Sequence, residues 1–268
     1  MLGVIAYPLG LAVWLGFSDA VPGTDGNWVG LANYRYLLGL STYRQVLLNT
    51  AVFSLTSTAL KAALGLGMAF ALQRDFRGRR LVYAFCFLPF VFPPSIGATA
   101  WYYLLSNVHG AFNYALLGAH LVTQPIAFTG SGIGPMASVV TVDVWHGTAL
   151  FGILCLAALR SIPAATVDAA ATDGANAWRR FLHLQLPLLR PALLLASLLS
   201  LIGNFGDFAI VFLLTGGGPL GKTDIISTSA FANALVVGDL GVGAAVALSV
   251  VPAYLVVLVV AFRLLRDR

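Results

Sequence analysis

Long apolar runs alternate with short polar segments along most of this chain. A helix that crosses a bilayer needs about 20 predominantly apolar residues. Six runs meet or approach this length, at about 2–17, 46–72, 81–105, 134–159, 191–214 and 240–264. The pattern predicts an all-α membrane protein with six transmembrane helices. We expect a single transmembrane domain that covers residues 1–268.

The first apolar run is short and begins almost at Met1. A cleaved signal peptide is the alternative interpretation. Such a peptide carries a basic segment before its apolar core and small residues at its cleavage site. Both features are missing here, so the pattern favours a membrane span.

Composition supports the membrane assignment. Hydrophobic residues make up 59% of the chain and charged residues 9%, whereas soluble proteins carry about 25% charged residues. Cys86 and Cys155 lie inside apolar runs and are expected to be small buried side chains. The four histidines lack the spacing of metal ligands. We therefore expect no metal site and no cofactor in this chain.

Arginine residues gather on one side of the predicted spans. This side carries Arg74, Arg77, Arg79, Arg80, Arg160, Arg179, Arg180, Arg190, Arg263, Arg266 and Arg268. The other side carries Arg35, Arg44 and Lys222. Cytoplasmic loops of membrane proteins are enriched in Lys and Arg. Both termini and the 161–187 segment are thus predicted to be cytoplasmic. Because the basic residues border lipid-embedded spans, we expect no nucleic-acid partner.

Aromatic residues mark the first of the predicted external loops, 18–45, 106–133 and 215–239. Tyr34, Tyr36 and Tyr43 predict an interfacial belt or a short surface helix, because tyrosine favours the membrane–water boundary.

Three prolines interrupt the third apolar run, at positions 89, 93 and 94. Proline removes a backbone donor and bends a helix. In a membrane the freed carbonyls need a neighbouring helix or a cavity. A kink beside a translocation path and a kink that only serves packing are both open interpretations.

The polar segment 161–187 has the pattern of two helices. Pro163 fits the first turn of a helix, and the alanines that follow it favour helix. Gly174 supplies a left-handed residue that ends this helix, and Asn176 can cap the next one. A loop of two surface helices without a partner is the plain alternative.

The second helix of this segment is predicted to be amphipathic. Trp178, Phe181, Leu182 and Leu186 form one apolar stripe at helical spacing. Pro187 and Pro191 are expected to end the segment, so that the chain enters the fifth span afresh.

Motifs in this segment resemble the EAA loop of binding-protein-dependent ABC importers. The residues are Asp168-Ala169-Ala170, Asp173-Gly174-Ala175, Phe181 and Leu186-Pro187. Asp168 stands where the family usually has Glu. The resemblance extends along the chain to further motifs. These are Val29-Gly30-Leu31-Ala32-Asn33-Tyr34, Asn49-Thr50, the stretch from Leu88-Pro89 to Pro93-Pro94, and Leu214-Thr215-Gly216-Gly217-Gly218-Pro219. The last one is similar to the hallmark of carbohydrate permeases of the maltose/glycerol-phosphate A type.

The resemblance implies one permease subunit of an ATP-driven importer of a di- or oligosaccharide in a bacterial or archaeal cytoplasmic membrane. Its partners would be a second permease, two copies of a cytoplasmic ATPase and an extracytoplasmic solute-binding protein. The segment 162–174 would be a coupling helix that docks on the ATPase. Its contacts would come from Asp168, Ala169, Ala170, Asp173 and Gly174.

Polar residues inside spans predict a substrate pocket, because they are costly in lipid. Ser200, Gly203, Asn204 and Asp207 recur at i, i+3, i+4 and i+7, which predicts one helix face. Phe205 or Trp145 could provide a flat apolar surface for a sugar. Hydrogen bonding between helices is the alternative role of this face. The family resemblance adds His146, Gly147 and Leu150 to the predicted pocket.

Lys61 lies in the middle of the second span. A lone charge there costs about 3 kcal/mol. We expect it to pair with Asp143 or Asp207 in a structural role, unless it reaches the membrane surface.

Other functions fit the sequence less well. An importer of glycerol phosphate or another polyol ester would need Lys or Arg in the fourth and fifth spans to hold the phosphate. An ion-coupled secondary transporter would need its own ion site. A membrane enzyme would need a cluster of catalytic residues, and none stands out. The family resemblance places ATP and Mg²⁺ in the partner ATPase, so neither is expected in this chain.

Overall fold

The computed structural model describes residues 2–130 and 134–266. Helices dominate this part of the chain, and its one isolated β-bridge joins Ser18 and Trp28. The α-helices are α1 Leu2–Gly16, α2 Ala32–Gly39, α3 Ser41–Gln73, α4 Arg79–Val91, α5 Pro94–Leu104, α6 Ala111–Gly118, α7 Gly134–Arg160, α8 Ala164–Thr172, α9 Ala177–Arg180, α10 Leu186–Phe205, α11 Ala209–Thr215, α12 Ile226–Phe231, α13 Leu240–Leu248 and α14 Val251–Arg266. Two π-helical turns follow α9 and α12, at Phe181–Gln185 and Ala232–Val237.

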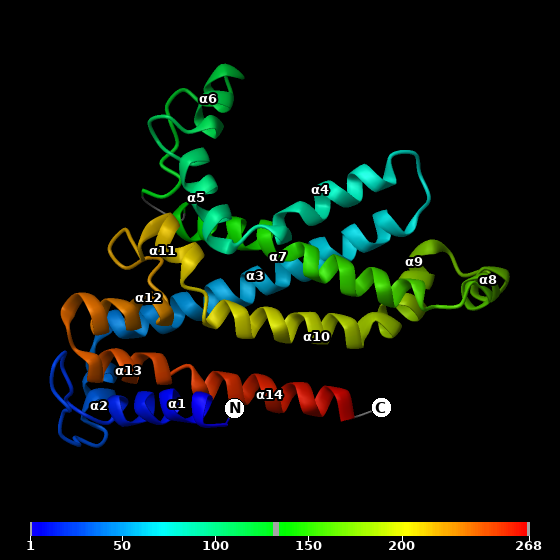
Figure 1. Ribbon diagram of the computed structural model, residues 1–268. Helices are drawn as coiled ribbons and strands as arrows, with labels where there is room; N and C mark the ends of the chain where they lie inside the picture. Colours follow the sequence, from blue (N-terminus) through cyan, green and yellow to red (C-terminus); the bar gives the residue numbers. More distant parts are fainter. Residues whose placement is uncertain (1, 131–133, 267–268) are drawn as a thin grey trace.

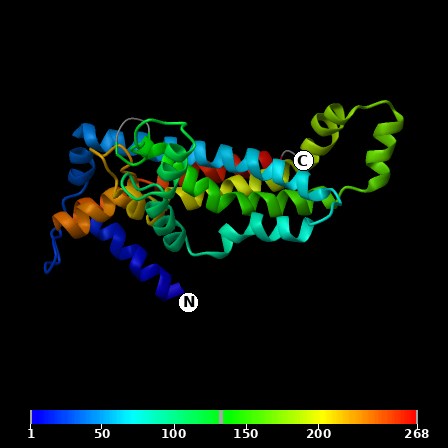
Figure 2. The ribbon, with the colours of Figure 1, turned by 90° about the horizontal axis from the view of Figure 1, so that it is seen from above.

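Three long helices, α3, α7 and α10, run side by side through the centre of the molecule (Figures 1 and 2). Helices α13 and α14 lie along one flank with α1, and α4 lies along the other (Figure 1). Small residues bring α3 and α7 close together. A Cβ on Gly65 would lie 2.3 Å from the Cβ of Phe151, so the two backbones approach as closely as glycine allows.

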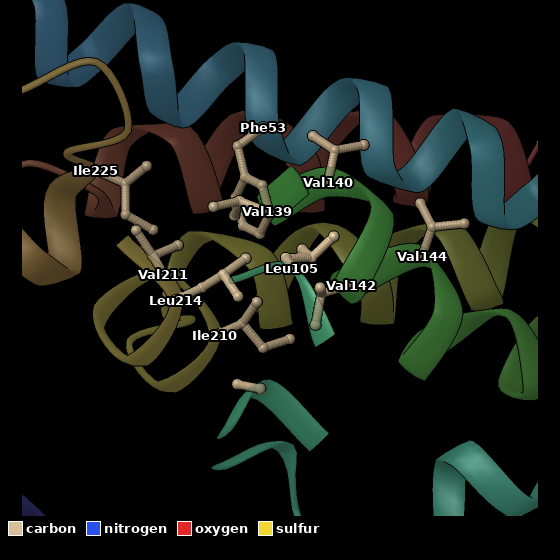
Figure 3. Packing of buried hydrophobic residues seen from close by; sticks show 11 residues of the cluster. Phe53, Leu105, Val139, Val140, Val142, Val144, Ile210, Val211, Leu214 and Ile225 are labelled. Atoms are coloured by element: carbon tan, nitrogen blue, oxygen red, sulfur yellow. The ribbon is translucent and has the colours of Figure 1, made fainter. Parts of the chain in front are cut away.

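Apolar side chains fill the space between α3, α5, α7 and α11 (Figure 3). Phe53 of α3 is completely buried there beside Val139 and Val142 of α7. Ile210 and Val211 of α11 close the cluster on the other side. This cluster fixes α11 against the end of the central helices.

Four helical segments are long and apolar enough to cross a membrane: Ser41–Gln73, Gly134–Arg160, Ala177–Phe205 and Leu240–Ala261. They confirm the second, fourth and sixth predicted spans in position. The bent pair α4–α5 brings the number to five if it is one span. Helix α1 has 15 residues in the described part of the chain and is too short to count as a span beside these four. The first predicted span, 2–17, therefore stays a prediction, and with it the total of six.

The predicted third span, 81–105, is not one helix. It breaks into α4 and α5, whose axes differ by 102°. Phe92 and Pro93 adopt extended conformations at the break. Proline restricts the residue before it to extended backbone, and Pro93-Pro94 therefore turns a kink into a sharp corner.

The predicted bounds of the fifth span, 191–214, were wrong at both ends. The helix starts at Ala177 and ends at Phe205. Pro187 does not begin a new element, because the π-helical turn Phe181–Gln185 joins α9 to α10 without a break. At the other end the chain leaves the helix at Gly206, and the short helix α11 follows.

The two ends of the bundle differ in the segments they carry. Loop 74–78, the end of α7 and the pair α8–α9 lie at one end, and α2, α6, α11 and α12 lie towards the other (Figure 1). The arginine-rich segments thus share one end. That this end is cytoplasmic stays a prediction.

The tyrosines of the first loop divide between two environments. Tyr34 and Tyr36 lie on the short helix α2, which matches the surface-helix alternative. Tyr43 belongs to α3 and is buried among apolar side chains, so an interfacial position is wrong for this residue. Cys155 is buried as predicted, and Cys86 is half-buried.

Candidate functional site

The exposed pair α8–α9 has the local structure that its sequence predicts. Pro163 comes directly before α8 as its N-cap residue rather than inside the first turn. Gly174 has a φ of +80°, and the N–H of Ala175 donates to the carbonyl of Ala170 at 3.0 Å. Such a left-handed residue satisfies the last carbonyls of a helix. Asn176 Oδ1 accepts a hydrogen bond from Arg179 N at 2.9 Å and caps α9.

Helix α8 projects beyond the ends of the central helices (Figures 1 and 2). None of its residues is buried. Asp168, Ala169, Asp173 and Gly174 are exposed, and Ala170 is half-buried. The five residues predicted to contact a partner therefore lie on an accessible element.

The apolar stripe of the following helix divides between surface and core. Phe181 packs edge-on against Phe70 of α3, with ring centroids 5.3 Å apart. Trp178 is 65% exposed. Phe181 thus anchors the base of the projecting segment to α3, while Trp178 in the first turn of α9 stays exposed.

A cavity of about 510 Å³ lies between α3, α4, α7, α10 and the start of α11. All seven residues predicted for the substrate pocket line this one cavity: His146, Gly147, Leu150, Ser200, Gly203, Asn204 and Asp207. Binding sites for small molecules commonly measure about 300–1,000 Å³. The cavity therefore has the size of a ligand pocket.

Lys61 occupies the wall of this cavity and is almost completely buried. Its Nζ lies 2.8 Å from Oδ1 and 2.7 Å from Oδ2 of Asp143. The ammonium also donates to Asn204 Oδ1 at 3.0 Å. Of the two predicted partners of Lys61, Asp143 is confirmed. A buried charge needs this compensation, because an unpaired ion in the interior is strongly unfavourable.

Ser200 and Asn204 are held by the same network. Ser200 Oγ lies 3.0 Å from Thr58 Oγ1 and 3.4 Å from Lys61 Nζ. Asn204 Nδ2 donates to the carbonyl of Ser54 at 3.4 Å. Hydrogen bonding between helices, the alternative role of this face, therefore accounts for part of what these two side chains do.

The two pocket glycines have different surroundings. A Cβ on Gly147 would lie 2.6 Å from Cε of Lys61, so this glycine makes room for the lysine side chain. A Cβ on Gly203 would meet no atom within 4 Å. Gly203 therefore borders open space.

Asp207 does not share a helix face with Ser200 and Asn204, as the spacing predicted. It follows the end of α10, and its Oδ1 accepts a hydrogen bond from the N–H of Ile210 at 3.1 Å. The carboxylate thus caps the first turn of α11. It reaches the same cavity through the turn of the chain at Gly206.

His146 links the pocket to the corner between α4 and α5. Its Nε2 lies 3.1 Å from the carbonyl oxygen of Phe92, and because that oxygen can only accept, Nε2 carries the proton. Phe90 and Pro94 on either side of the corner also line the cavity. The proline kink therefore lies beside the pocket.

The aromatic side chains at the pocket are not the ones predicted. Phe90, Phe151 and Phe208 line the cavity. Phe205 instead packs on Tyr254, and Trp145 packs on Trp101. Helical spacing around the polar residues could not show this, because Phe90 and Phe151 come from other helices and Phe208 lies beyond the end of α10.

The Asn49-Thr50 motif contacts a loop that is far away in the sequence, at the other end of the bundle. Asn49 Nδ2 donates to the carbonyls of Gly221 and Asp224 at 2.8 and 2.9 Å. Thr50 Oγ1 accepts from the N–H of Ile226 at 3.0 Å. Burial raises the pKa of Asp224, and the hydrogen bond from Thr228 opposes this shift. The Asn49-Thr50 motif thus ties the loop that follows Leu214–Pro219 to α3.

Comparison with known proteins identifies the family. The family of binding-protein-dependent transport system inner membrane components matches residues 62–267. The chain belongs to this family. Helices α7 to α14, with the pocket residues of α7 and α10 and the projecting α8, all lie within the matched residues of this transport component.

Named relatives cover most of this transport component. The trehalose/maltose transport system permease protein MalF of Thermococcus litoralis is 36% identical over 82% of the chain and 74% of its own length. The probable ABC transporter permease protein y4oQ of Sinorhizobium fredii is 36% identical over 90% of the chain and 78% of its own length. A bacterial ABC transporter involved in import of the acidic polysaccharide alginate shares the fold. The two structures superpose with a TM-score of 0.85 at 21% sequence identity. The superposition covers 99% of this chain and 91% of the alginate transporter chain.

Proposed function

We propose that this chain is the permease subunit of an ATP-driven importer of a di- or oligosaccharide. The observation that carries the proposal is the cavity beside Lys61, in which all seven residues expected to contact a sugar meet. Sugars need hydrogen-bonding groups beside flat apolar surfaces. His146 and Asp207 supply the first, and the rings of Phe90 and Phe208 supply the second.

A phosphorylated polyol fits this cavity less well. Among the described residues that line the cavity, Lys61 is the one with a Lys or Arg side chain. Asp143 already neutralises its charge. A phosphate would have to break that ion pair or remain without a cation. The relative named for trehalose and maltose supports a neutral sugar as cargo.

Helix α8 would transmit movement from the ATPase. In this proposal a partner ATPase grips α8 through Asp168, Ala169, Ala170, Asp173 and Gly174. Closure of the two ATPase copies would then displace α8 and switch the pocket between outward and inward access. The exposure of α8 and its position beyond the bundle support this role.

The complete importer would contain further subunits. We expect a second permease, two ATPase copies and an external solute-binding protein, with the α8 end in the cytoplasm of a bacterium or archaeon. Most of the described surface of α10 is apolar and accessible. In the most apolar stretch of Ala177–Phe205, 17% of the residues are buried inside this chain. The rest form a wide face for lipid or for the second permease.

Transport in proteoliposomes tests the proposed cargo. The full complex would be reconstituted with its binding protein and offered labelled trehalose, maltose or glycerol 3-phosphate. We expect uptake of a sugar that depends on ATP. Gly203→Leu should reduce this uptake at least tenfold while basal ATP hydrolysis persists, because the new side chain enters open pocket space.

Leu199→Met is the matched control, because Leu199 lies on the exposed face of the same helix and should transport normally. Normal sugar uptake by Gly203→Leu would remove the cavity from the transport path. Uptake of glycerol 3-phosphate alone would replace the sugar assignment with the polyol ester.

A further inference from the structure

A second cavity, of about 500 Å³, lies between α4 and α7 and is lined at one end by three arginines. Arg79 and Arg80 begin α4, and Arg160 ends α7. This arginine pocket is separate from the cavity beside Lys61, with which it shares no lining residue. The sugar transport proposed above makes no use of it.

A tyrosine holds two of the guanidinium groups side by side. The hydroxyl of Tyr83 accepts hydrogen bonds from Arg160 at 2.8 Å and from Arg79 at 3.3 Å. Arg79 also lies over the Tyr83 ring, 5.4 Å from its centroid. Two positive groups that share one hydroxyl oxygen repel each other. The arrangement is therefore suited to an anion that both groups can bind.

Negative charge at the pocket is insufficient to balance the arginines. Asp75 forms a salt bridge with Arg79, but its side chain is 95% exposed and faces solvent. Nε of Arg79 is buried, and no hydrogen-bond acceptor among the described residues reaches it. A donor buried without an acceptor is unfavourable, so the pocket is incomplete as it stands.

The pocket changes from charged to apolar along both helices. On α4 the lining proceeds from Arg79 through Tyr83 to Phe87, a rise of about 12 Å. On α7 it proceeds from Arg160 back through Leu156 to Ile153, about 10 Å. A polar anchor followed by an apolar groove of this length fits an amphiphile with an anionic head.

We propose that the arginine pocket binds the phosphate of an anionic phospholipid, with the acyl chains lying along the groove between α4 and α7. The arginine-bearing ends of both helices lie at the end of the bundle that carries α8 (Figure 1). Basic pockets between membrane helices recognise such headgroups. The bound lipid would brace the α4 arm of the bent span against α7.

Lipid retention by the purified complex tests this proposal. The full complex would be placed in nanodiscs of phosphatidylglycerol or phosphatidylcholine, washed in mild detergent, and its remaining lipid measured by mass spectrometry. We expect selective retention of phosphatidylglycerol. Each basic residue contributes about fivefold to such binding, so Arg79→Gln with Arg160→Gln should weaken retention about 25-fold.

Arg80→Gln is a second variant that tests the same pocket without disturbing the fold. Arg80 is exposed, and its truncation leaves the hydrogen bonds of Tyr83 in place. It should weaken retention about fivefold. Arg190→Gln on α10 lies outside the pocket and should retain phosphatidylglycerol as the unchanged protein does.

Three results would overturn the proposal. Equal retention by all variants would show that the pocket holds no lipid. Stabilisation by millimolar inorganic phosphate in place of the lipid would indicate a site for a free anion. Loss of a partner subunit from the arginine variants, with lipid retention unchanged, would show that an acidic segment of that partner occupies the pocket.

Discussion

Gly147 and Lys61 are packed so closely that a single methyl group on the glycine would displace the lysine. The added carbon would lie 2.6 Å from Cε and 2.9 Å from Nζ. Lys61 cannot withdraw freely, because Asp143 and Asn204 hold its ammonium. A glycine that was expected to contact substrate thus also makes the ion pair possible.

We predict that Gly147→Ala destabilises the protein. Overpacking costs about 1–3 kcal/mol, and the gain in helix propensity of about 0.5–1 kcal/mol offsets only part of it. The melting temperature in detergent should fall by several degrees. Gly203→Ala is the matched control: its methyl group meets no atom within 4 Å, so stability should be kept or rise. Equal melting temperatures for Gly147→Ala and Gly203→Ala would contradict the packing of Gly147 on Lys61.

The ion pair Lys61–Asp143 should show strong coupling. Breaking a buried pair by removing one partner costs about 3–5 kcal/mol, whereas replacing both partners with apolar residues is often neutral. Lys61→Met and Asp143→Leu should each lower the yield and the melting temperature, and the double variant should recover most of the loss. Additive losses in a double-mutant cycle would show that the two charges do not depend on one another.

His146 should control the corner between α4 and α5. His146→Leu leaves the Phe92 carbonyl without the donor that now lies 3.1 Å away, and because this hydrogen bond is exposed its loss should cost about 0.5–1.5 kcal/mol. His146→Gln can still donate and should restore part of the stability. Hydrogen exchange at α4 and α5 measures the effect, with faster exchange expected for the leucine variant alone. Identical exchange in both variants would remove His146 from this role.

Gly174 should be essential for coupling but not for folding of this subunit. Gly174→Asp places a charged side chain where the structure leaves open space, so the protein should insert normally yet lose ATP-driven uptake. Gly78→Asp is the control, because Gly78 has a similar φ of +85° and equally open surroundings outside α8. It bears the same backbone strain without the contact. Normal transport by Gly174→Asp would exclude α8 as the ATPase contact.

Much of this architecture follows from local sequence rules. The left-handed glycine at 174, the cap at Asn176 and the pairing of Lys61 all depend on short-range chemistry or on the cost of charge in lipid. The convergence of seven pocket residues rested on the family resemblance as well as on helical spacing. The structure brings them together, and whether they contact a sugar stays a prediction.

Other features depended on contacts that the sequence does not reveal. The π-helical turn Phe181–Gln185 lets the chain pass Pro187 in a helix, although proline there indicated a break. Pro93 and Pro94 predicted a bend, but its angle of 102° and the packing of α5 on α11 and α7 depend on contacts between segments far apart in the sequence. Phe208 became a pocket residue because α10 ends at Phe205 and the chain turns at Gly206 towards α11.

One uninterrupted helical segment, Ala177–Phe205, joins the base of the projecting α8 to the pocket. Its 29 residues span about 43 Å at the ordinary helical rise. An axial shift applied at Ala177 must therefore move Asn204 by a similar amount or deform the π-helical turn between them. Asn204 accepts a hydrogen bond from Lys61. The same shift would therefore displace the one buried ion pair between α3 and α7 in the described structure.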